Sequence, residues 1–235
     1  MSDAVVVTDI ERAPADLVDR LGGYGVATVH EALDRVGYLG PRFRPVHPAS
    51  IAGPAVTALC WPGDNLMIHA AVEQCRPGDV LVVTTTSPST DGMFGELLAT
   101  SLQARGVRGA VIDAGARDVA ELREMGFPVW STAVSAQGTV KSTAGSVNVP
   151  VVLGGQRVCP GDAVVADEDG VLCVPRADVA RAIEGARARV ENEAASREAF
   201  RAGELGLDRY GMREKLAGLG VRYLSAAEYA RERRS

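Results

Sequence analysis

The sequence predicts an α/β protein, and two observations in residues 84–130 carry this prediction. The first is the order of patterns: the end of an apolar strand, a polar loop, a helix that begins at Gly95 and Glu96, a second apolar strand at residues 110–112, and a further helix. Alternating strands and helices are typical of a sheet with parallel strands. The second is that charged residues follow both strands, and ligands of such sheets bind beyond the carboxyl ends of the strands. We therefore expect the functional site there.

The composition is typical of a soluble enzyme and argues against a nucleic-acid-binding protein. Of the 235 residues, 46% are hydrophobic and only 5% are aromatic, so the core must consist mainly of Val, Ala and Leu. Lys and Arg total 25 against 30 acidic residues, and nucleic-acid affinity needs the opposite balance. The N-terminus lacks the pattern of a signal peptide, and no apolar run has the length of a membrane span. These patterns predict a cytoplasmic protein with neither nucleic acid nor a membrane as partner.

Two helices are predicted before the first strand. Residues 15–21 have the pattern of a short helix, which the glycine-rich segment 22–25 ends. Thr28 is a suitable N-cap for a second helix, with Glu31 three residues later as in a capping box, and Gly37 is expected to end it. The apolar face of this helix would consist of Val29, Leu33 and Val36.

Two turns with the same sequence are predicted to introduce two strands. A first strand is expected at residues 55–59, and the Pro-Gly-Asp turn at residues 77–79 opens a second strand at residues 80–85. The same triplet recurs at residues 160–162, which indicates an equivalent turn into another strand of a sheet.

The segment after the central stretch is predicted to contain antiparallel pairs. Residues 139–152 alternate weakly between apolar and polar side chains, which indicates a strand and its return. Asp169 and Gly170 stand between two apolar runs, and this dipeptide is a strong signal for a hairpin.

The C-terminal quarter predicts helices. Residues 177–202 form a long helix whose apolar stripe is narrow, and such a helix with little to bury in its own domain is often a contact between subunits. The tail at residues 203–235 is too apolar for a disordered tag, and it either packs on the main body or docks on a neighbouring subunit. We therefore divide the chain into one α/β catalytic domain, residues 1–175, and a helix and tail that form a subunit contact, residues 176–235.

Four charged side chains are expected to meet in the central cleft. Glu96, Asp113 and Asp118 supply carboxylates, and Arg117 supplies a guanidinium suited to a substrate carboxylate. Carboxylates in proximity repel one another unless a proton or a cation intervenes. Because the ligand atoms are all oxygens, Mg²⁺ or Mn²⁺ fits this set better than zinc. The alternative is that Asp118 only caps its helix and Arg117 only makes a surface ion pair.

The predicted chemistry is cleavage of a 2-oxo acid. A guanidinium, helix N–H groups and a metal ion can together hold the carboxylate and the keto oxygen of such a substrate and stabilise an enolate. Both aldol cleavage and decarboxylation of a β-keto acid pass through an enolate. A Schiff-base route would need a lysine, and the chain has only Lys141 and Lys215. Lys141 either reaches the ligand or lies at a hydrophilic strand edge. No nucleotide-binding glycine motif is present.

Four segments together resemble a known family of aldolases. They are GELLA at residues 95–99, VIDAGARDV at 111–119, NVPVVLGGQRVCPGD at 148–162 and VVADEDGVLCVP at 164–175. They are similar to the 4-hydroxy-4-methyl-2-oxoglutarate / 4-carboxy-4-hydroxy-2-oxoadipate aldolases, whose fold is shared with the regulator of ribonuclease activity A. The tail sequence GELGLDRYGMREKL resembles the aldolase branch, since the regulators generally end sooner.

The resemblance implies a fold and an assembly. The fold would be a three-layer β/β/α sandwich of the swivelling-domain type with a C-terminal helical extension. The subunits would form a homotrimer or a homohexamer, with the active sites between subunits.

The resemblance also implies roles for residues of the central cleft. Asp118 would bind the divalent metal, Mg²⁺ or Mn²⁺, and Arg117 would bind the pyruvate carboxylate and the leaving-group oxygen. Glu96 would hold metal-bound waters, although the family often has aspartate at this position. The backbone of Gly95, Glu96, Leu97 and Leu98 would contact pyruvate.

A neighbouring subunit is expected to supply one further acidic residue. Glu193 is the best match to the family, and Glu191 and Glu198 are the alternatives. With Asp113 as a further catalytic residue, the chain would be a class II pyruvate aldolase, a carbon-carbon lyase. It would cleave a 4-hydroxy-4-carboxy-2-oxo acid and also decarboxylate oxaloacetate. The alternative function is that of a non-catalytic oligomer that binds a ribonuclease or a helicase.

Overall fold

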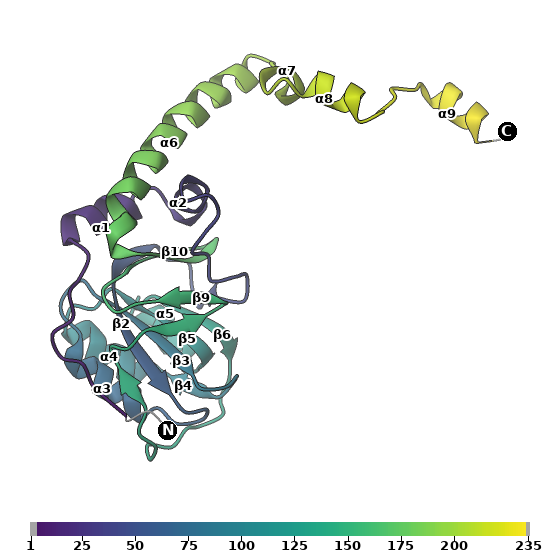
Figure 1. Cartoon of the computed structure of the whole chain (residues 1–235). Helices are drawn as coiled ribbons and strands as arrows, with labels where there is room; N and C mark the ends of the chain where they lie inside the picture. Colours follow the sequence, from purple (N-terminus) through teal and green to yellow (C-terminus); the bar gives the residue numbers. More distant parts are fainter. Residues whose placement is uncertain (1–3, 234–235) are drawn as a thin grey trace. The chain divides into compact units, whose positions relative to one another are not determined.

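The computed structural model describes residues 4–233 and shows a mixed α/β fold (Figure 1). The main sheet has the strand order β1-β6-β5-β3-β2-β10-β11. Its central strands run parallel to one another because helices connect them. These strands are β2 (Ile51–Cys60), β3 (Val80–Thr85), β5 (Gly109–Ala116) and β6 (Val129–Val134).

Shorter strands complete this sheet: β1, β10 and β11 extend it at its edges, β4 pairs with β5, and β7 pairs with β2. The predicted hairpin at Asp169 and Gly170 is confirmed, since β10 and β11 pair antiparallel across it and β10 also pairs with β2. A separate small sheet consists of β8 and β9. The short strands are β1 (Arg44–Pro45), β4 (Gly92–Phe94), β7 (Ser146–Val147), β8 (Val151–Leu153), β9 (Gln156–Val158), β10 (Ala163–Asp167) and β11 (Gly170–Val174).

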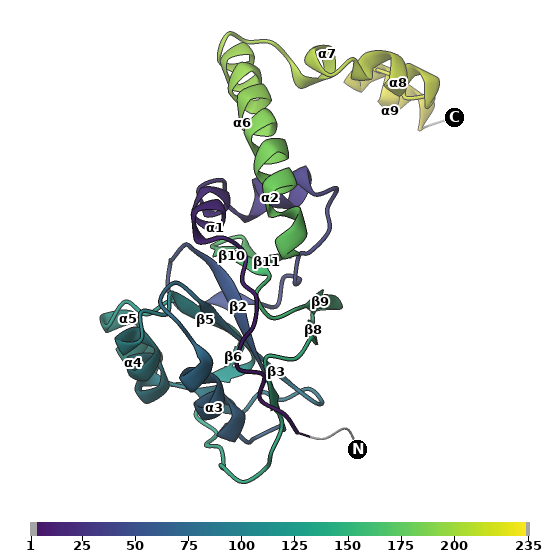
Figure 2. The same cartoon turned by 60° about the vertical axis from the view of Figure 1, so that its left-hand side comes forward.

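Helices cover one face of the main sheet, and other strands cover its opposite face. Figure 2 shows α3, α4 and α5 on one side of the strands and the β8–β9 sheet on the other. The side chains of β3 alternate accordingly: Leu81 and Val83 pack toward the helices, while Val80 and Val82 pack toward Val158 and the second β layer. The predicted three-layer β/β/α sandwich is therefore confirmed. The helices are α3 (Leu66–Gln74), α4 (Glu96–Ala104) and α5 (Val119–Glu124).

A further cluster of buried apolar side chains lies outside these three layers. It consists of side chains from α1 (Ala15–Gly22), α2 (Val26–Ala32) and the first turns of α6 (Val179–Arg201), packed against the β10–β11 hairpin. The predicted helix at residues 15–21 is thus confirmed.

The predicted bounds of α2 are wrong. The helix begins at Val26 rather than after Thr28, because the carboxylate of Asp167 accepts the N–H of Val26 at 2.8 Å and satisfies the helix start from another strand. At its end, Asp34 takes a left-handed conformation with φ of 55°. Val36 is therefore 60% exposed instead of lying on the apolar face.

The prediction of a strand and its return over residues 139–152 is also wrong in its first half. Residues 141–145 have no regular secondary structure, and only β7 and β8 form further along. The loop is fixed by Asp64, far away in sequence, whose carboxylate accepts the N–H groups of Ser142 and Thr143. A local pattern does not reveal such contacts.

The two Pro-Gly-Asp turns are confirmed and are structurally alike. The carboxylate of Asp79 accepts the N–H of Arg76 at 2.7 Å, and the carboxylate of Asp162 accepts the N–H of Cys159 at 2.8 Å. Each glycine has a positive φ, which suits glycine best. Strands β3 and β10 begin directly after these turns.

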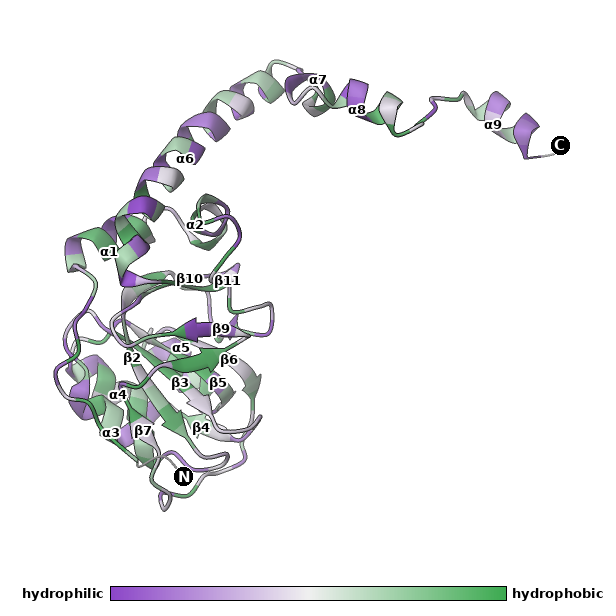
Figure 3. Ribbon diagram, viewed as in Figure 1, coloured by the Kyte–Doolittle hydropathy of each residue, from purple (hydrophilic) through white to green (hydrophobic). Residues whose placement is uncertain are grey.

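The chain divides into two compact units, Met1–Ala188 and Arg189–Ser235. The boundary lies within α6, because the first turns of that helix bury Val179 and Ile183 in the first unit. No residue is buried in the described helices of the second unit, and Figure 3 shows hydrophilic purple recurring along α6. These helices are α7 (Gly206–Arg209), α8 (Met212–Gly218) and α9 (Ala226–Glu232).

No helix in residues 4–233 combines the length and the apolar character that crossing a bilayer requires.

Candidate active site

The predicted cleft forms where β4 and β5 end next to each other. These strands pair in parallel, and the backbone N–H of Arg117 donates to the carbonyl oxygen of Phe94 at 2.8 Å. The starts of α4 and α5 are therefore neighbours. This arrangement brings Gly95, at the start of α4, against Arg117 and Asp118, at the start of α5.

Gly95 is required here because the two segments approach so closely. A Cβ atom on Gly95 would lie 2.9 Å from Cγ of Arg117, and it would lie even closer to a carboxylate oxygen of Asp118. The backbone of Gly95 is extended, so the absence of a side chain matters and its conformational freedom does not. Any other residue would push Arg117 and Asp118 away from the start of α4.

Asp118 connects the two helix starts. Its backbone is left-handed, with φ of 54° and ψ of 41°, which is unfavourable for a residue other than glycine and often occurs at functional sites. Its carboxylate does not cap its own helix; it accepts the N–H of Glu96 at 3.1 Å and lies 3.5 Å from Nε of Arg117. The alternative interpretation, in which Asp118 only caps its own helix, is therefore not found. The side chain is 39% exposed, so carboxylate oxygen remains available to a ligand.

A small pocket of about 90 Å³ opens beside Arg117. Arg117 lines one side, next to the start of α4, and Lys141 belongs to the same lining. A site with two cationic side chains and helix N–H groups suits a small anion with more than one acidic group. The full lining consists of Asn65, His69, Met93, Gly95, Leu97, Leu98, Arg117 and Lys141.

Asn65 presents an unused hydrogen-bond acceptor in this pocket. The residue is only 6% exposed, and its Nδ2 donates to the carbonyl oxygen of Met93 at 3.1 Å. Its Oδ1 is buried and has no partner among the described residues. Because buried polar atoms are normally hydrogen-bonded, this oxygen suits a hydroxyl group or a water molecule of a ligand complex.

His69 lies in the same pocket, one turn further along α3. Burial lowers the pKa of His69, and the charge of Lys141 lowers it further. The imidazole is therefore neutral at neutral pH and retains one nitrogen that can accept a proton or a hydrogen bond.

The predicted residues of α4 have different surroundings. Glu96 lies at the first position of the helix, and its Oε1 accepts the hydroxyl of Thr100 at 2.8 Å. Leu98 is buried, whereas Leu97 is 76% exposed at the pocket. Gly95, Leu97 and Leu98 line the pocket, while Glu96 is not part of this lining and its side chain is bonded along its own helix.

Asp113 does not join this pocket. Strand β5 continues to Ala116, with an irregular register toward β6 between Ile112 and Gly115, so Asp113 lies within a strand and not in a turn. Its carboxylate pairs with Nη2 of Arg42 at 2.7 Å and lines a separate pocket of about 340 Å³. Burial raises the pKa of Asp113, and the charge of Arg42 only partly offsets this effect. The expected meeting of three carboxylates is therefore not found.

Glu193 lies in the second unit, where its carboxylate pairs with Nε of Arg189 at 2.8 Å along α6. Its predicted role depends on a neighbouring subunit.

Asn65 and His69 were not predicted as site residues, and for Lys141 the sequence allowed either a contact with the ligand or a place at a strand edge. A signal existed for the first two, because the Asp64-Asn65 pair precedes an apolar helix that carries a histidine on the side of the predicted cleft. No local signal placed Lys141 there, since its loop is held by distant residues.

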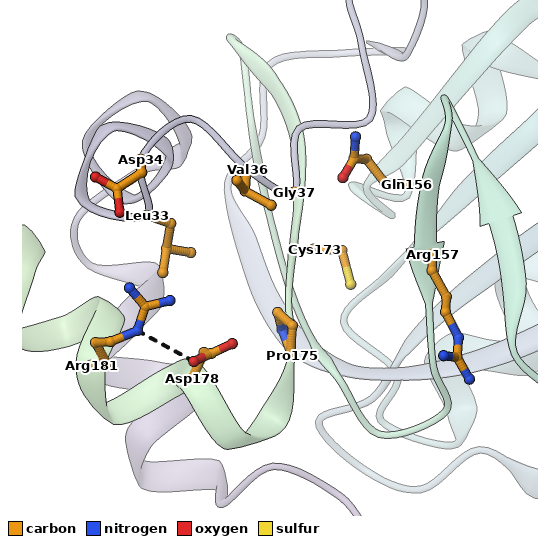
Figure 4. A pocket seen from close by; sticks show the side chains of 10 residues that line it. All are labelled: Leu33, Asp34, Val36, Gly37, Gln156, Arg157, Cys173, Pro175, Asp178 and Arg181. Carbon is orange, nitrogen blue, oxygen red and sulfur yellow. Dashed lines mark hydrogen bonds and ion pairs between the residues drawn. The ribbon is translucent and has the colours of Figure 1, made fainter.

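A larger pocket of about 320 Å³ contains none of the predicted site residues. Figure 4 shows it between the loop after α2, the hairpin strand β11 and the start of α6, with Leu33 and Cys173 among its lining. Its Arg181 is paired with Asp178 at 3.3 Å. No pair of adjacent charged residues at a strand end contributes to this pocket, whereas Arg117 lines the smaller one.

Comparison with known proteins gives a consistent family. Residues 26–173 match the family described as RraA-like: Aldolase/RraA. A protein of Halalkalibacterium halodurans named "Putative 4-hydroxy-4-methyl-2-oxoglutarate aldolase" is 26% identical over 192 residues, covering 81% of this chain and 91% of that protein. A protein of Burkholderia multivorans with the same name is 38% identical over 135 residues, covering 57% of this chain and 82% of that protein.

A solved structure shares the fold. The crystal structure of Streptomyces coelicolor RraAS2, described as an unusual member of the RNase ES inhibitor RraA protein family, is 31% identical and has a TM-score of 0.72. The match covers 80% of this chain and 99% of that one.

Proposed function

The chain belongs to the RraA-like family, and we propose that it is a divalent-metal-dependent aldolase. It would cleave a 4-hydroxy-4-carboxy-2-oxo acid, such as 4-hydroxy-4-methyl-2-oxoglutarate, to pyruvate and a second oxo acid, and it would decarboxylate oxaloacetate as a side activity. The observation that supports this most is the pocket in which Arg117 and Lys141 flank the start of α4, with Asp118 adjacent. The names of the relatives agree with an aldolase.

The pyruvate half of the substrate fits the side of the pocket formed by Arg117 and α4. The first N–H groups of a helix have no partner within the helix, and Leu97 and Leu98, which belong to the first turn of α4, line the pocket. Together with the planar guanidinium of Arg117, they can hold a carboxylate and the neighbouring keto oxygen. Since Asp118 already occupies the N–H of Glu96, the anion is directed toward the next positions of the helix.

The residues beside this position fit a magnesium-type ion. Among the described residues, no three His, Cys, Asp or Glu side chains are placed to share a metal ion. Mg²⁺ is commonly bound through one or two carboxylates plus water and substrate oxygens, and Asp118 has exposed carboxylate oxygen. Such a cation would take up the negative charge that develops on the keto oxygen during cleavage.

Cleavage requires a proton to leave the C4 hydroxyl group. As it leaves, the bond between C3 and C4 breaks, the second oxo acid is released, and the electron pair of that bond forms the enolate of pyruvate. A proton added at C3 then completes pyruvate. Oδ1 of Asn65 and the neutral imidazole of His69 are the acceptors that can bind the hydroxyl. Arg117 stabilises the oxyanion of the enolate.

Lys141 suits the carboxylate at C4, because it lies in the same pocket as Arg117 and carries a second positive charge. The same position makes Lys141 the residue through which a Schiff base would form. Only Lys141 and Lys215 could do so. The proposal assigns Lys141 to charge recognition, so borohydride added with substrate should not inactivate the enzyme.

A coupled pyruvate assay with a panel of 4-hydroxy-2-oxo acids tests the proposed function. Chelator should abolish pyruvate release, and Mg²⁺ or Mn²⁺ should restore it. Full activity in excess chelator, or a borohydride-trapped adduct on Lys141, would contradict the metal-dependent mechanism.

The alternative function is regulation of a ribonuclease or a helicase. The observation that favours it is the similarity to a member of the RNase ES inhibitor family over 80% of the chain. If no pyruvate is released under any metal condition and the chain binds and inhibits a ribonuclease E type enzyme, the regulator becomes the better assignment.

Assembly is a further part of the proposal. The helices α7, α8 and α9 bury no residue in the described chain, and short helices are marginal in water without a packing partner. We expect a trimer or a hexamer in which Glu193 of one subunit reaches the site of another. Light scattering should give the mass of three or six chains. Glu193→Gln should reduce activity, whereas Glu198→Gln on the same helix should not. A fully active monomer would contradict this assembly.

A further inference from the structure

Asp64 is a buried carboxylate with three hydrogen bonds to the backbone. It is only 2% exposed. Its Oδ2 accepts the N–H groups of Ser142 at 2.8 Å and Thr143 at 2.7 Å, and its Oδ1 accepts the N–H of Leu66 at 2.9 Å. Burial by itself would raise the pKa of Asp64, but the N–H groups hold this pKa below its usual range. The carboxylate is therefore charged at neutral pH, when its hydrogen bonds are strongest.

These bonds join two segments that lie on either side of the candidate active site. One is the start of α3, which carries Asn65 and His69. The other is the loop that carries Lys141. We call the contact between these two segments the junction. Backbone hydrogen bonds support it: the N–H of Asn65 donates to the carbonyl oxygen of Val140 at 3.0 Å, and the N–H of Val140 donates to the carbonyl oxygen of Gly63 at 2.9 Å.

The loop around Lys141 depends on this junction for its position. Residues 141–145 have no regular secondary structure, and the backbone bonds of the junction end at Val140, directly before Lys141. The side chain of a lysine has many rotamers, and a mobile backbone would enlarge the volume that its ammonium group can reach. The bonds of Asp64 to the two residues after Lys141 restrict that volume to the side of the pocket.

We propose that Asp64 is a positioning residue that holds Lys141 beside the pocket for recognition of the substrate carboxylate at C4. This role rests on the proposed aldolase function for its consequence in catalysis, but the placement of Lys141 can be measured without it. Asp64 does not touch the substrate, and it acts by joining the Lys141 loop to the start of α3.

Asp64→Asn is the most direct test in the intact protein. The amide keeps the size of the carboxylate but has one accepting oxygen and no negative charge. Either the bond to Leu66 or the bonds to Ser142 and Thr143 are therefore lost, and the remaining bonds are no longer charge-assisted. KM for a substrate with a C4 carboxylate should rise about tenfold, as expected for the loss of a hydrogen bond to a charged group. Exchange of the pyruvate methyl protons with solvent deuterium should change little, because it needs only the pyruvate half of the site.

A matched control and a double variant separate positioning from general damage. Asp162→Asn makes the same change at another buried carboxylate that accepts two backbone N–H groups, at Cys159 and Arg176, outside the pocket. It should leave KM unchanged. Lys141→Gln should raise KM as Asp64→Asn does, and the double variant should be no worse than Lys141→Gln alone.

A measurement independent of activity decides the placement. The chain has only two lysines, so ¹³C-dimethylation gives two lysine signals, which Lys141→Gln assigns. The Lys141 signal should be distinct from that of exposed Lys215 in the parent, and it should move toward the Lys215 signal in Asp64→Asn. If Asp64→Asn does not fold, Thr143→Pro is the second variant. It removes the N–H that residue 143 donates to Asp64 and leaves the carboxylate of Asp64 intact. An unchanged Lys141 signal in the folded variant overturns the positioning role, whereas absence of pyruvate release in the parent overturns only the aldolase assignment.

Discussion

Asp113 and Asp118 are close in sequence at the end of β5, yet their carboxylates have different surroundings. Asp113 has a side chain 14% exposed and is paired with Arg42 at 2.7 Å. Asp118 has a side chain 39% exposed and accepts one helix N–H at 3.1 Å. The first carboxylate is mostly buried and closely paired with a guanidinium, while the second lies 3.5 Å from Nε of Arg117 and retains exposed oxygen for a ligand. Proximity to a strand end is therefore not sufficient to make a carboxylate part of a site.

The backbone explains the difference. The irregular register of β5 between Ile112 and Gly115 directs Asp113 into the pocket that contains Arg42. The left-handed backbone of Asp118 directs its carboxylate to the start of α4.

The largest expected effect concerns the arginines of the two pockets. Arg117→Lys should reduce the rate of pyruvate release by about two orders of magnitude, because an ammonium group cannot reproduce the planar two-point contact of a guanidinium to an oxyanion. Arg42→Lys is the matched control, since Arg42 contacts Asp113 in the other pocket. Near-parental rates for both variants would place the chemistry elsewhere.

Asp118→Asn should also lose activity, but in a way that depends on the metal concentration. The amide can still accept the N–H of Glu96, so the junction between the helices remains, while the negative charge that attracts a cation is lost. Raising Mg²⁺ should partly restore pyruvate release in this variant and not in Arg117→Lys. Equal responses of the two variants to Mg²⁺ would remove the distinction between their roles.

Asp113→Asn should change activity by no more than about threefold, because Asp113 lies outside the pocket that contains Arg117. Its effect on stability should depend on pH. Burial raises the pKa of Asp113 in the folded protein, so the protonated form of this side chain contributes to the free energy of unfolding. This contribution is fully present below the pKa that Asp113 has in the unfolded chain, and it is lost as pH rises through the pKa that it has in the folded protein. The melting temperature of the parent relative to Asp113→Asn should therefore fall as pH rises through the carboxyl range. A relative melting temperature that rises with pH would contradict this assignment.

The smallest expected effect is on the titration of His69. Burial and the charge of Lys141 both lower the pKa of His69, so Lys141→Gln should raise this pKa part of the way toward its ordinary value. The chain has only three histidines, and NMR titration can follow each ring. An unchanged His69 titration would show that the Lys141 ammonium is not near the imidazole.

Local patterns predicted the elements that depend on local chemistry. The start of α4 at Glu96, strand β3 at residues 80–85, and the hairpin at Asp169 and Gly170 follow from apolar runs and turn residues, and each is confirmed. The family motif around Arg117 and Asp118 indicated the edge of the sheet where a small pocket forms.

The errors have a common physical cause. The start of α2 is set by Asp167, a residue 141 positions away that accepts the first helix N–H. Asp113 was assigned to the cleft because a linear pattern cannot show an irregular register within a strand.

The sequence by itself determined the α/β class and the family, because periodicity and motif are written in neighbouring residues. It also placed Arg117 and Asp118 between a strand and a helix. Only the tertiary structure decided which polar side chains share the pocket. Lys141 lies on a loop in which the N–H groups of Ser142 and Thr143 donate to Asp64, 78 and 79 positions earlier in the chain. Such contacts depend on how strands and helices pack, and this packing is not visible in the spacing of residues along the chain.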